Sequence, residues 1–258
     1  MWARIESQLA EARNAVIPLY GPRGKRIPVH GGCGVLINLN ENLFVLTASH
    51  VHESLDSHAE GQFLAATDGQ FIPLNGRSYR TNSIGSEEDI FDAAVLEIEQ
   101  GAEADLLRPL SLKVVPADIV VGAPTGECVV FGYPHRDAEK TRGRTVTPKS
   151  YWWHGSAIAP ESYSNLGINP QSHVAMELDL ASVITEHGQM QRSLVPKGVS
   201  GSGMWSLVES ERAQLNGIFV AARDGLFLGT SIRAHLTLIA QHDAAVFDAW
   251  WVDDRRFL

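Results

Sequence analysis

The chain has 258 residues, of which 44% are hydrophobic and 20% charged, a composition typical of a globular protein with one large or two small closely packed domains. Its net charge of −9 and pI near 5.5 argue against a surface that binds phosphate backbones, so we expect no nucleic-acid partner. No stretch approaches the roughly 18 apolar residues of a membrane span, so we expect no membrane partner either.

The N-terminal segment carries Arg4 and Glu6 where a secretory signal would need an unbroken apolar region. Residues 2–16 instead have apolar side chains at helical spacing, which predicts an amphipathic helix. The two cysteines, Cys33 and Cys128, lie within apolar runs and outside any C-x-x-C pattern. We therefore expect two buried thiols in a cytoplasmic protein, with neither a disulfide nor a metal site.

After the helix, short apolar runs alternate with turn residues, a pattern typical of antiparallel all-β architecture. The clearest hairpin joins 34–37 to 43–47 through a turn rich in asparagine. The segment 115–126, with its prolines and glycines, is the candidate linker between two sets of strands, and Ser231 is predicted to cap a C-terminal helix. Further strands are predicted at 62–66, 93–98, 110–115, 127–131, 174–180, 204–208, 217–221 and 226–230.

One serine lies among glycines about three-quarters of the way along the chain, in the segment 196–203, PKGVSGSG. A serine hydroxyl is a poor nucleophile unless a base takes its proton and donors hold the resulting oxyanion. Glycines permit backbone conformations in which consecutive N–H groups converge on one oxygen. Taken alone the segment favours a surface turn, so its meaning depends on the other residues present.

His50 is the candidate base, because it directly follows the predicted strand 43–47, where a sheet would fix its position. A histidine at a strand end is also commonly structural. His52 is an alternative base, and with His50 it forms an H-x-H pair of the kind that binds metals. No cysteine or acidic third ligand stands at a recognisable spacing, so we expect neither a metal nor a cofactor.

Asp92 is the candidate carboxylate, because it is in phase with the apolar face of the predicted strand 93–98. A carboxylate turned inward is costly without a partner, so the pattern implies a buried donor such as a histidine, whose tautomer the carboxylate would fix. The alternative is a cap on a buried backbone N–H. Asp89 falls on the other face, in an acidic cluster that we expect to be solvated.

The order His50, Asp92, Ser200 matches the chymotrypsin arrangement and differs from those of subtilisin and the α/β-hydrolases. The segment around Ser200 also lacks the G-x-S-x-G pattern, since Ser202 replaces the last glycine. Three segments resemble those of the chymotrypsin-like (trypsin-fold) serine peptidases: 47–50 (TASH) resembles T-A-A-H, 92–96 (DAAVL) resembles D-I-A-L-L, and 198–203 (GVSGSG) resembles G-D-S-G-G-P.

Two further segments are similar to bacterial members of that family. Residues 32–37 (GCGVLI) resemble a G-S-G-F-V-I strand, and Gly132-Tyr133-Pro134 resembles the G-Y-P or G-N-P of the glutamyl endopeptidase-like and heat-shock protease branches. The resemblance covers roughly residues 27–240. It implies two packed six-stranded antiparallel β-barrels with the site in the cleft between them. The implied division is 1–24 (helix and lead-in), 25–115 (first barrel), 116–230 (second barrel) and 231–258 (C-terminal helical segment).

The resemblance also implies roles for individual residues. It makes Ser200 the nucleophile, His50 the general base and later acid, and Asp92 the orienting carboxylate, with the backbone N–H groups of Gly198 and Ser200 as the oxyanion hole. The implied activity is that of a serine endopeptidase acting on proteins or peptides by acyl transfer. Val199 departs from the family, because it replaces the aspartate that receives the new N-terminus in trypsin-type zymogens. Control by a regulatory protein partner, by a loop movement or by substrate binding is therefore expected instead.

The substrate pocket implied by the resemblance is lined by Leu194, Val195, Lys197, Phe219 and Ala221. Leu194 stands where trypsin-like enzymes carry an aspartate, which favours a substrate with an apolar residue before the scissile bond. Lys197 at the rim keeps a substrate with an acidic residue at that position as an alternative. The stretch 151–169 differs from the family pattern. An alternative function is a catalytically silent or gated binding module on the same fold, for example in a bacterial stress or defence system.

Overall fold

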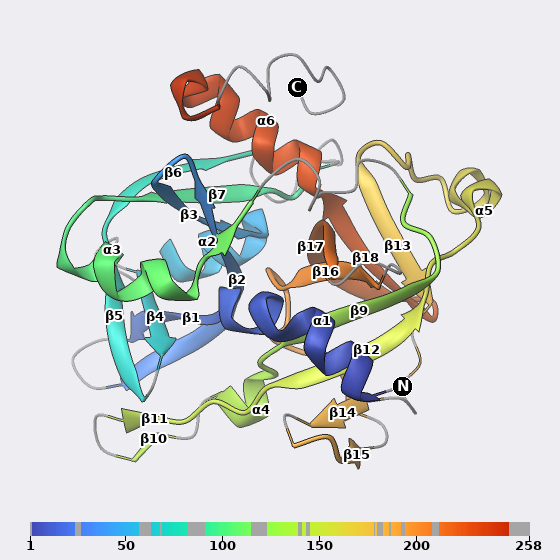
Figure 1. Cartoon of the computed structure of the whole chain (residues 1–258), viewed down its shortest axis with the longest axis horizontal. Helices are drawn as coiled ribbons and strands as arrows, with labels where there is room; N and C mark the ends of the chain where they lie inside the picture. Colours follow the sequence, from blue (N-terminus) through green and yellow to red (C-terminus); the bar gives the residue numbers. More distant parts are fainter. Residues whose placement is uncertain are drawn as a thin grey trace.

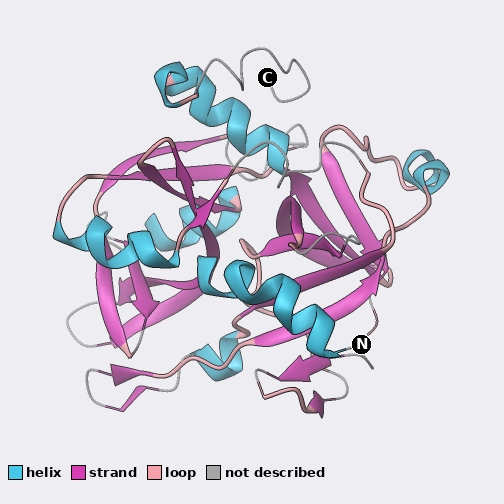
Figure 2. Ribbon diagram, viewed as in Figure 1, coloured by secondary structure: helices cyan, strands magenta, loops and turns pink. Residues whose placement is uncertain are grey.

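Two sheets make up most of the protein, with helices at their edges (Figures 1 and 2). The fold is mostly β, which confirms the predicted fold class. The computed structural model describes residues 2–23, 27–56, 63–67, 69–81, 91–114, 123–138, 141–142, 145–177, 179, 183–185, 187–191, 194–207 and 212–247.

The first sheet has the strand order β5-β4-β1-β2-β3-β7-β6, with β8 paired to β2. All its strand pairs are antiparallel except β2 and β8. The predicted hairpin is confirmed as β2 and β3, and its turn places Asn40 and Glu41 at positive φ. The strands are β1 (Val16–Arg23), β2 (Ile27–Leu39), β3 (Asn42–Thr47), β4 (Phe63–Thr67), β5 (Gln70–Leu74), β6 (Gly76–Arg80), β7 (Ala94–Ile98) and β8 (Leu112–Lys113).

The second sheet has the order β13-β18-β17-β16-β9-β12-β14-β15 and is antiparallel throughout. A separate small hairpin is formed by β10 (Thr141–Arg142) and β11 (Thr145–Val146). The strands of the second sheet are β9 (Glu127–Gly132), β12 (Tyr151–Ser156), β13 (His173–Glu177), β14 (Val183–Thr185), β15 (Met190–Gln191), β16 (Gly203–Leu207), β17 (Gln214–Arg223) and β18 (Leu226–Ser231).

Two of the helices, α1 and α6, pack against strands of both sheets. The predicted N-terminal helix is confirmed as α1 (Trp2–Ala15), which packs against β1, β2 and β16. Ser231 caps α6 (Ile232–His242) as predicted, because its Oγ accepts a hydrogen bond from the backbone N–H of Arg233. The other α-helices are α2 (Ser49–Asp56), α3 (Ala102–Leu107), α4 (His135–Ala138) and α5 (Pro160–Asn165).

The described sheets differ from the prediction in strand number, since each has eight strands where six were expected. The first sheet also begins earlier than expected, because β1 lies within the segment assigned to the lead-in at 1–24. The predicted linker 115–126 falls largely outside the described residues, and the domain boundaries stay predictions. No helix in the described residues has the length and apolar character needed to cross a membrane.

The three largest apolar clusters among the described residues form most of the core. A shared cluster joins both sheets to α1 and α6 and includes Leu46, Val95, Phe131, Trp152 and Ile218. A second cluster fills the interior of the first sheet, and a third fills the interior of the second. Because the shared cluster contains residues from both sheets, their relative position is fixed by buried apolar contacts.

The two cysteines lie in this core. Cys33 and Cys128 are buried and unbridged, as predicted, and burial raises the pKa of each thiol to about 11.

Candidate active site

His50 lies in the first turn of α2, which begins immediately after β3, and it contacts Asp92 twice. Its backbone N–H donates to Asp92 Oδ1 at 3.0 Å, and its Nδ1 lies 2.7 Å from Asp92 Oδ2. Because a carboxylate only accepts hydrogen bonds, Nδ1 carries a proton, so in the neutral form of the ring Nε2 is the acceptor. This is the tautomer that a general base needs.

Asp92 reaches His50 by a route that strand alternation did not anticipate. It lies two residues before β7 and has a φ of 38°, so the backbone turns before the strand begins. Its carbonyl also accepts the backbone N–H of Ser49 at 3.2 Å, which ties the start of α2 to this turn. The histidine partner predicted for Asp92 is thus present. However, the carboxylate is positioned by a left-handed turn of the backbone, whereas the prediction relied on the alternation of side chains along the strand.

Ser200 lies in a tight turn between Gly198 and Gly201, whose φ values are 86° and 91°. A side chain at Gly201 would collide with the carbonyl of Cys33, so only glycine fits there. The carbonyl of Ser200 accepts the backbone N–H of Cys33 at 2.7 Å, which anchors the turn to β2 of the first sheet. These contacts bring the segments predicted to act together to one place at the junction of the two sheets.

Gly32 shows how close the two halves of the site are. A Cβ placed on Gly32 would lie 2.7 Å from the carbonyl oxygen of Ser200 and 2.7 Å from Cγ2 of Val51, the residue after His50. The absence of a side chain at Gly32 therefore allows the serine turn and the histidine helix to approach each other.

The hydroxyl of Ser200 donates to the carbonyl oxygen of Val220 at 3.0 Å. Within the described residues it makes no hydrogen bond to His50. The carbonyl of Val220 is available because the pairing of β17 with β18 shifts register between Phe219 and Ala221. The histidine and carboxylate are thus paired, while the serine hydroxyl is held by β17.

The backbone around Gly198 carries two N–H groups whose hydrogen bonding can be followed in the described chain. The carbonyl of Lys197 accepts the backbone N–H of His135 at 2.9 Å. Since the C=O and N–H of a trans peptide point in opposite directions, this bond turns the N–H of Gly198 away from His135. Within the described chain, the backbone N–H groups of Gly198 and Ser200 donate to no other backbone group. Both donors remain available for an oxyanion.

The residues predicted to form the substrate pocket fall into two groups. Leu194 and Phe219 are 3% and 1% exposed and belong to the interior cluster of the second sheet, where Phe219 packs edge-on against Phe227. Val195, Lys197 and Ala221 are exposed. The assignment of the five residues to substrate binding stays a prediction.

His52, the alternative base, is buried against the ring of Phe63, with ring centroids 4.8 Å apart. Burial lowers the pKa of its imidazole, which keeps the ring neutral. No group of three or more histidine, cysteine or acidic residues that could hold a metal occurs in the described chain.

Sequence reasoning missed two residues behind the histidine and the carboxylate. His235 of α6 is fully buried, and its Nε2 lies 2.9 Å from the carbonyl oxygen of Thr47. Thr230 of β18 donates its hydroxyl to the carbonyl of Phe91. No local pattern could have identified them, because they lie 188 and 139 residues from their partners.

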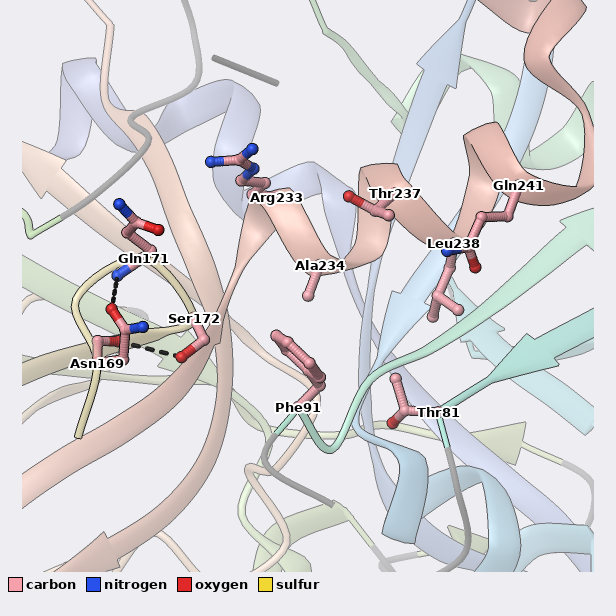
Figure 3. Close-up of a pocket in the computed structure, with 10 residues that line it drawn as sticks. All are labelled: Thr81, Phe91, Asn169, Gln171, Ser172, Arg233, Ala234, Thr237, Leu238 and Gln241. Atoms are coloured by element: carbon pink, nitrogen blue, oxygen red, sulfur yellow. Dashed lines mark hydrogen bonds between the residues drawn. The ribbon is translucent and has the colours of Figure 1, made fainter. Parts of the chain in front are cut away.

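A cavity of about 350 Å³ lies beside the segment that carries Asp92 (Figure 3). Phe91 faces it from one side and α6 from the other, and Asn169, Gln171 and Ser172 close one end.

No protein-family model and no curated protein sequence matches this chain. Among solved structures, human heparin binding protein is similar, with a TM-score of 0.52, 13% identity and coverage of 90% of each chain. At this identity the likeness shows the fold alone, which is trypsin-like.

Proposed function

We propose that the protein is a serine endopeptidase that cleaves peptide bonds by acyl transfer, with Ser200 as nucleophile, His50 as general base and Asp92 as orienting carboxylate. The observation that carries the proposal is the double contact between Asp92 and His50, which leaves Nε2 of the imidazole free to take a proton. The positive-φ turn that holds Ser200 beside two unused backbone N–H groups supports it.

In the proposed reaction the Ser200 hydroxyl first rotates from the Val220 carbonyl toward Nε2 of His50. His50 takes the hydroxyl proton as Oγ attacks the peptide carbonyl carbon, and the N–H groups of Gly198 and Ser200 hold the oxyanion. The intermediate collapses to an acyl-enzyme as His50 passes the proton to the leaving amine. Water then attacks the acyl carbon, again with His50 as base, which releases the carboxylic acid and restores Ser200.

Control would act on the serine turn. Val199 is fully buried and packs in the second-sheet interior, so apolar packing stabilises this turn where an ion pair with a new N-terminus would otherwise be needed. The hydrogen bond from Ser200 to Val220 defines a resting state with low basal activity, and a regulatory protein partner that favours the rotated hydroxyl would raise that activity.

The experiment that tests the proposal is labelling of the intact protein with a fluorophosphonate probe. We expect covalent labelling at Ser200 that is lost in Ser200→Ala and His50→Ala. Ser202→Ala is the matched control, because it removes the neighbouring hydroxyl, which is fully buried, and should retain labelling. A folded wild-type protein that is never labelled would contradict the proposal.

A second candidate function is a gated or catalytically silent binding module. The hydrogen bond that turns Ser200 toward Val220 favours it, and the similar human structure is itself named for binding. Under this alternative Ser200→Ala would leave partner binding unchanged. Labelling and peptide cleavage would be absent from the wild type.

A further inference from the structure

The C-terminal part of the second sheet reaches across to the two backbone segments that position His50 and Asp92. Helix α6 packs against β6 and β7 of the first sheet as well as β17 and β18 of the second (Figure 1). His235 on this helix contacts the carbonyl of Thr47, which ends β3 three residues before His50. Thr230, two residues before the helix, contacts the carbonyl of Phe91, the neighbour of Asp92.

The contact made by His235 has a defined direction. A carbonyl oxygen only accepts, so Nε2 of His235 carries the proton and donates across the 2.9 Å separation. The ring is completely buried, and burial lowers its pKa, so the imidazole stays neutral. Thr47 is held a second time, because its hydroxyl donates to the carbonyl of Cys33 at 2.7 Å.

The hydrogen bond to the Phe91 carbonyl matters because the side chain of Phe91 is only partly buried. The ring of Phe91 is 36% exposed and borders the cavity beneath Ala234 and Leu238 (Figure 3). The next residue, Asp92, has a left-handed backbone conformation, which costs on the order of 1 kcal/mol or more and persists only when its surroundings hold it. The hydrogen bond from Thr230 fixes the peptide that leads into this turn.

We propose that His235 and Thr230 are positioning residues, which hold the Thr47 and Phe91 carbonyls from behind and thereby maintain the contact between His50 and Asp92. The effect of these two residues on catalysis rests on the proposed peptidase function, but the contact between His50 and Asp92 can be observed without catalysis. Through these two bonds the end of β18 and the first turn of α6 set the geometry of the base.

The test uses three variants of the full-length chain. His235→Leu removes the donor to Thr47, Thr230→Val removes the donor to Phe91 at nearly constant shape, and His235→Gln keeps a donor near the place of Nε2. Ile239→Ala is the matched control, because Ile239 is buried on the same helix in the shared apolar cluster and donates to neither carbonyl through its side chain.

Two measurements separate positioning from general stability. The first is the NMR signal of the Nδ1 proton of His50, which the hydrogen bond to Asp92 shifts downfield and protects from exchange. The second is fluorophosphonate labelling, resolved into the maximal rate and the half-saturating probe concentration. We expect His235→Leu and Thr230→Val to broaden or lose the proton signal and to lower the maximal rate by at least about tenfold, with little change in half-saturation. His235→Gln and Ile239→Ala should retain both.

The proposal is overturned if both donor-deleting variants keep the Nδ1 signal and label within about twofold of the wild type. It is also overturned if Ile239→Ala, at an equal loss of thermal stability, produces the same changes as His235→Leu. If His235→Leu does not fold, the near-isosteric Thr230→Val decides. A wild type that is never labelled but loses its Nδ1 signal in the variants would refute the peptidase while supporting the positioning role.

Discussion

The carboxylate of Asp92 determines which nitrogen of His50 carries the proton. Nδ1 of His50 donates to it, and the two side chains are partly exposed, at 35% and 28%. Ser200 approaches from the second sheet, but its hydroxyl is bonded to Val220. Under the proposed mechanism, the step between the resting and reactive states is a single side-chain rotation.

Asp92→Asn tests the tautomer assignment. The amide retains the size of the carboxylate but presents an N–H₂ group, so Nδ1 would have to lose its proton and Nε2 would gain one. We expect fluorophosphonate labelling to fall by about 10⁴-fold, the loss that the wrong tautomer causes in a Ser-His-Asp triad. Glu97→Gln in β7, the strand that follows Asp92, is the control. Equal labelling rates for Asp92→Asn and the wild type would refute the assignment.

His30 provides a test of stability against pH. Burial, and secondarily the charge of His135, lowers its pKa from 6.5 to about 3. Between these values the unfolded chain takes up a proton that the folded protein refuses, so the free energy of unfolding falls as the pH falls, by up to about 1.4 kcal/mol per unit. His30→Phe should flatten this slope in urea titrations between pH 7 and pH 4. Parallel curves for the two proteins would contradict the prediction.

At the scale of elements, the serine turn depends on glycines held at positive φ. Gly198 has a φ of 86°, and a Cβ there would lie 2.8 Å from the backbone nitrogen of His135. Gly225, in the turn between β17 and β18, has a similar φ of 77° but open space around it. At both positions a side chain would be strained by the positive φ. Only at Gly198 would it also collide with a neighbouring backbone atom.

Gly198→Ala should therefore displace the peptide bonded to His135 and abolish labelling. Gly225→Ala should cost only about 1–2 kcal/mol of unfolding free energy, from its φ alone, and retain labelling. Chemical denaturation and labelling of both variants measure the comparison. Normal labelling of Gly198→Ala would show that this peptide does not form the anion site.

The sequence predicted the elements that have clear local patterns. The hairpin of β2 and β3 has apolar runs on both sides of an asparagine turn, and the order His50, Asp92, Ser200 points to one arrangement of three residues. Strand β12 was missed because Tyr151, Trp152 and Trp153 are all buried, so no alternation marks it. The hydrogen bonds made by Ser200 and His235 could not be predicted from the sequence, because they join residues that only the fold brings together.

At the scale of the whole molecule, the candidate site is divided between two sheets. His50 follows β3 and Asp92 precedes β7 in the first sheet, while Ser200 precedes β16 in the second. The shared apolar cluster joins these halves through buried residues such as Leu46 of β3 and Ile218 of β17. If this cluster dominates the cooperativity of folding, neither sheet should unfold independently of the other.

Leu43→Ala tests that cooperativity. Leu43 is fully buried in the interior of the first sheet and does not belong to the shared cluster, so its truncation removes contacts from one half alone. A Leu→Ala change in a core costs about 2–5 kcal/mol. With cooperative unfolding, hydrogen exchange of the slowest amides should accelerate by the same factor in β3 of the first sheet and in β16 of the second.

Leu106→Ala is the control, because its side chain is 62% exposed, and it should change neither exchange rate. Acceleration confined to the first sheet would mean that the halves unfold separately. The relative position of His50 and Ser200 would then depend on two independent equilibria.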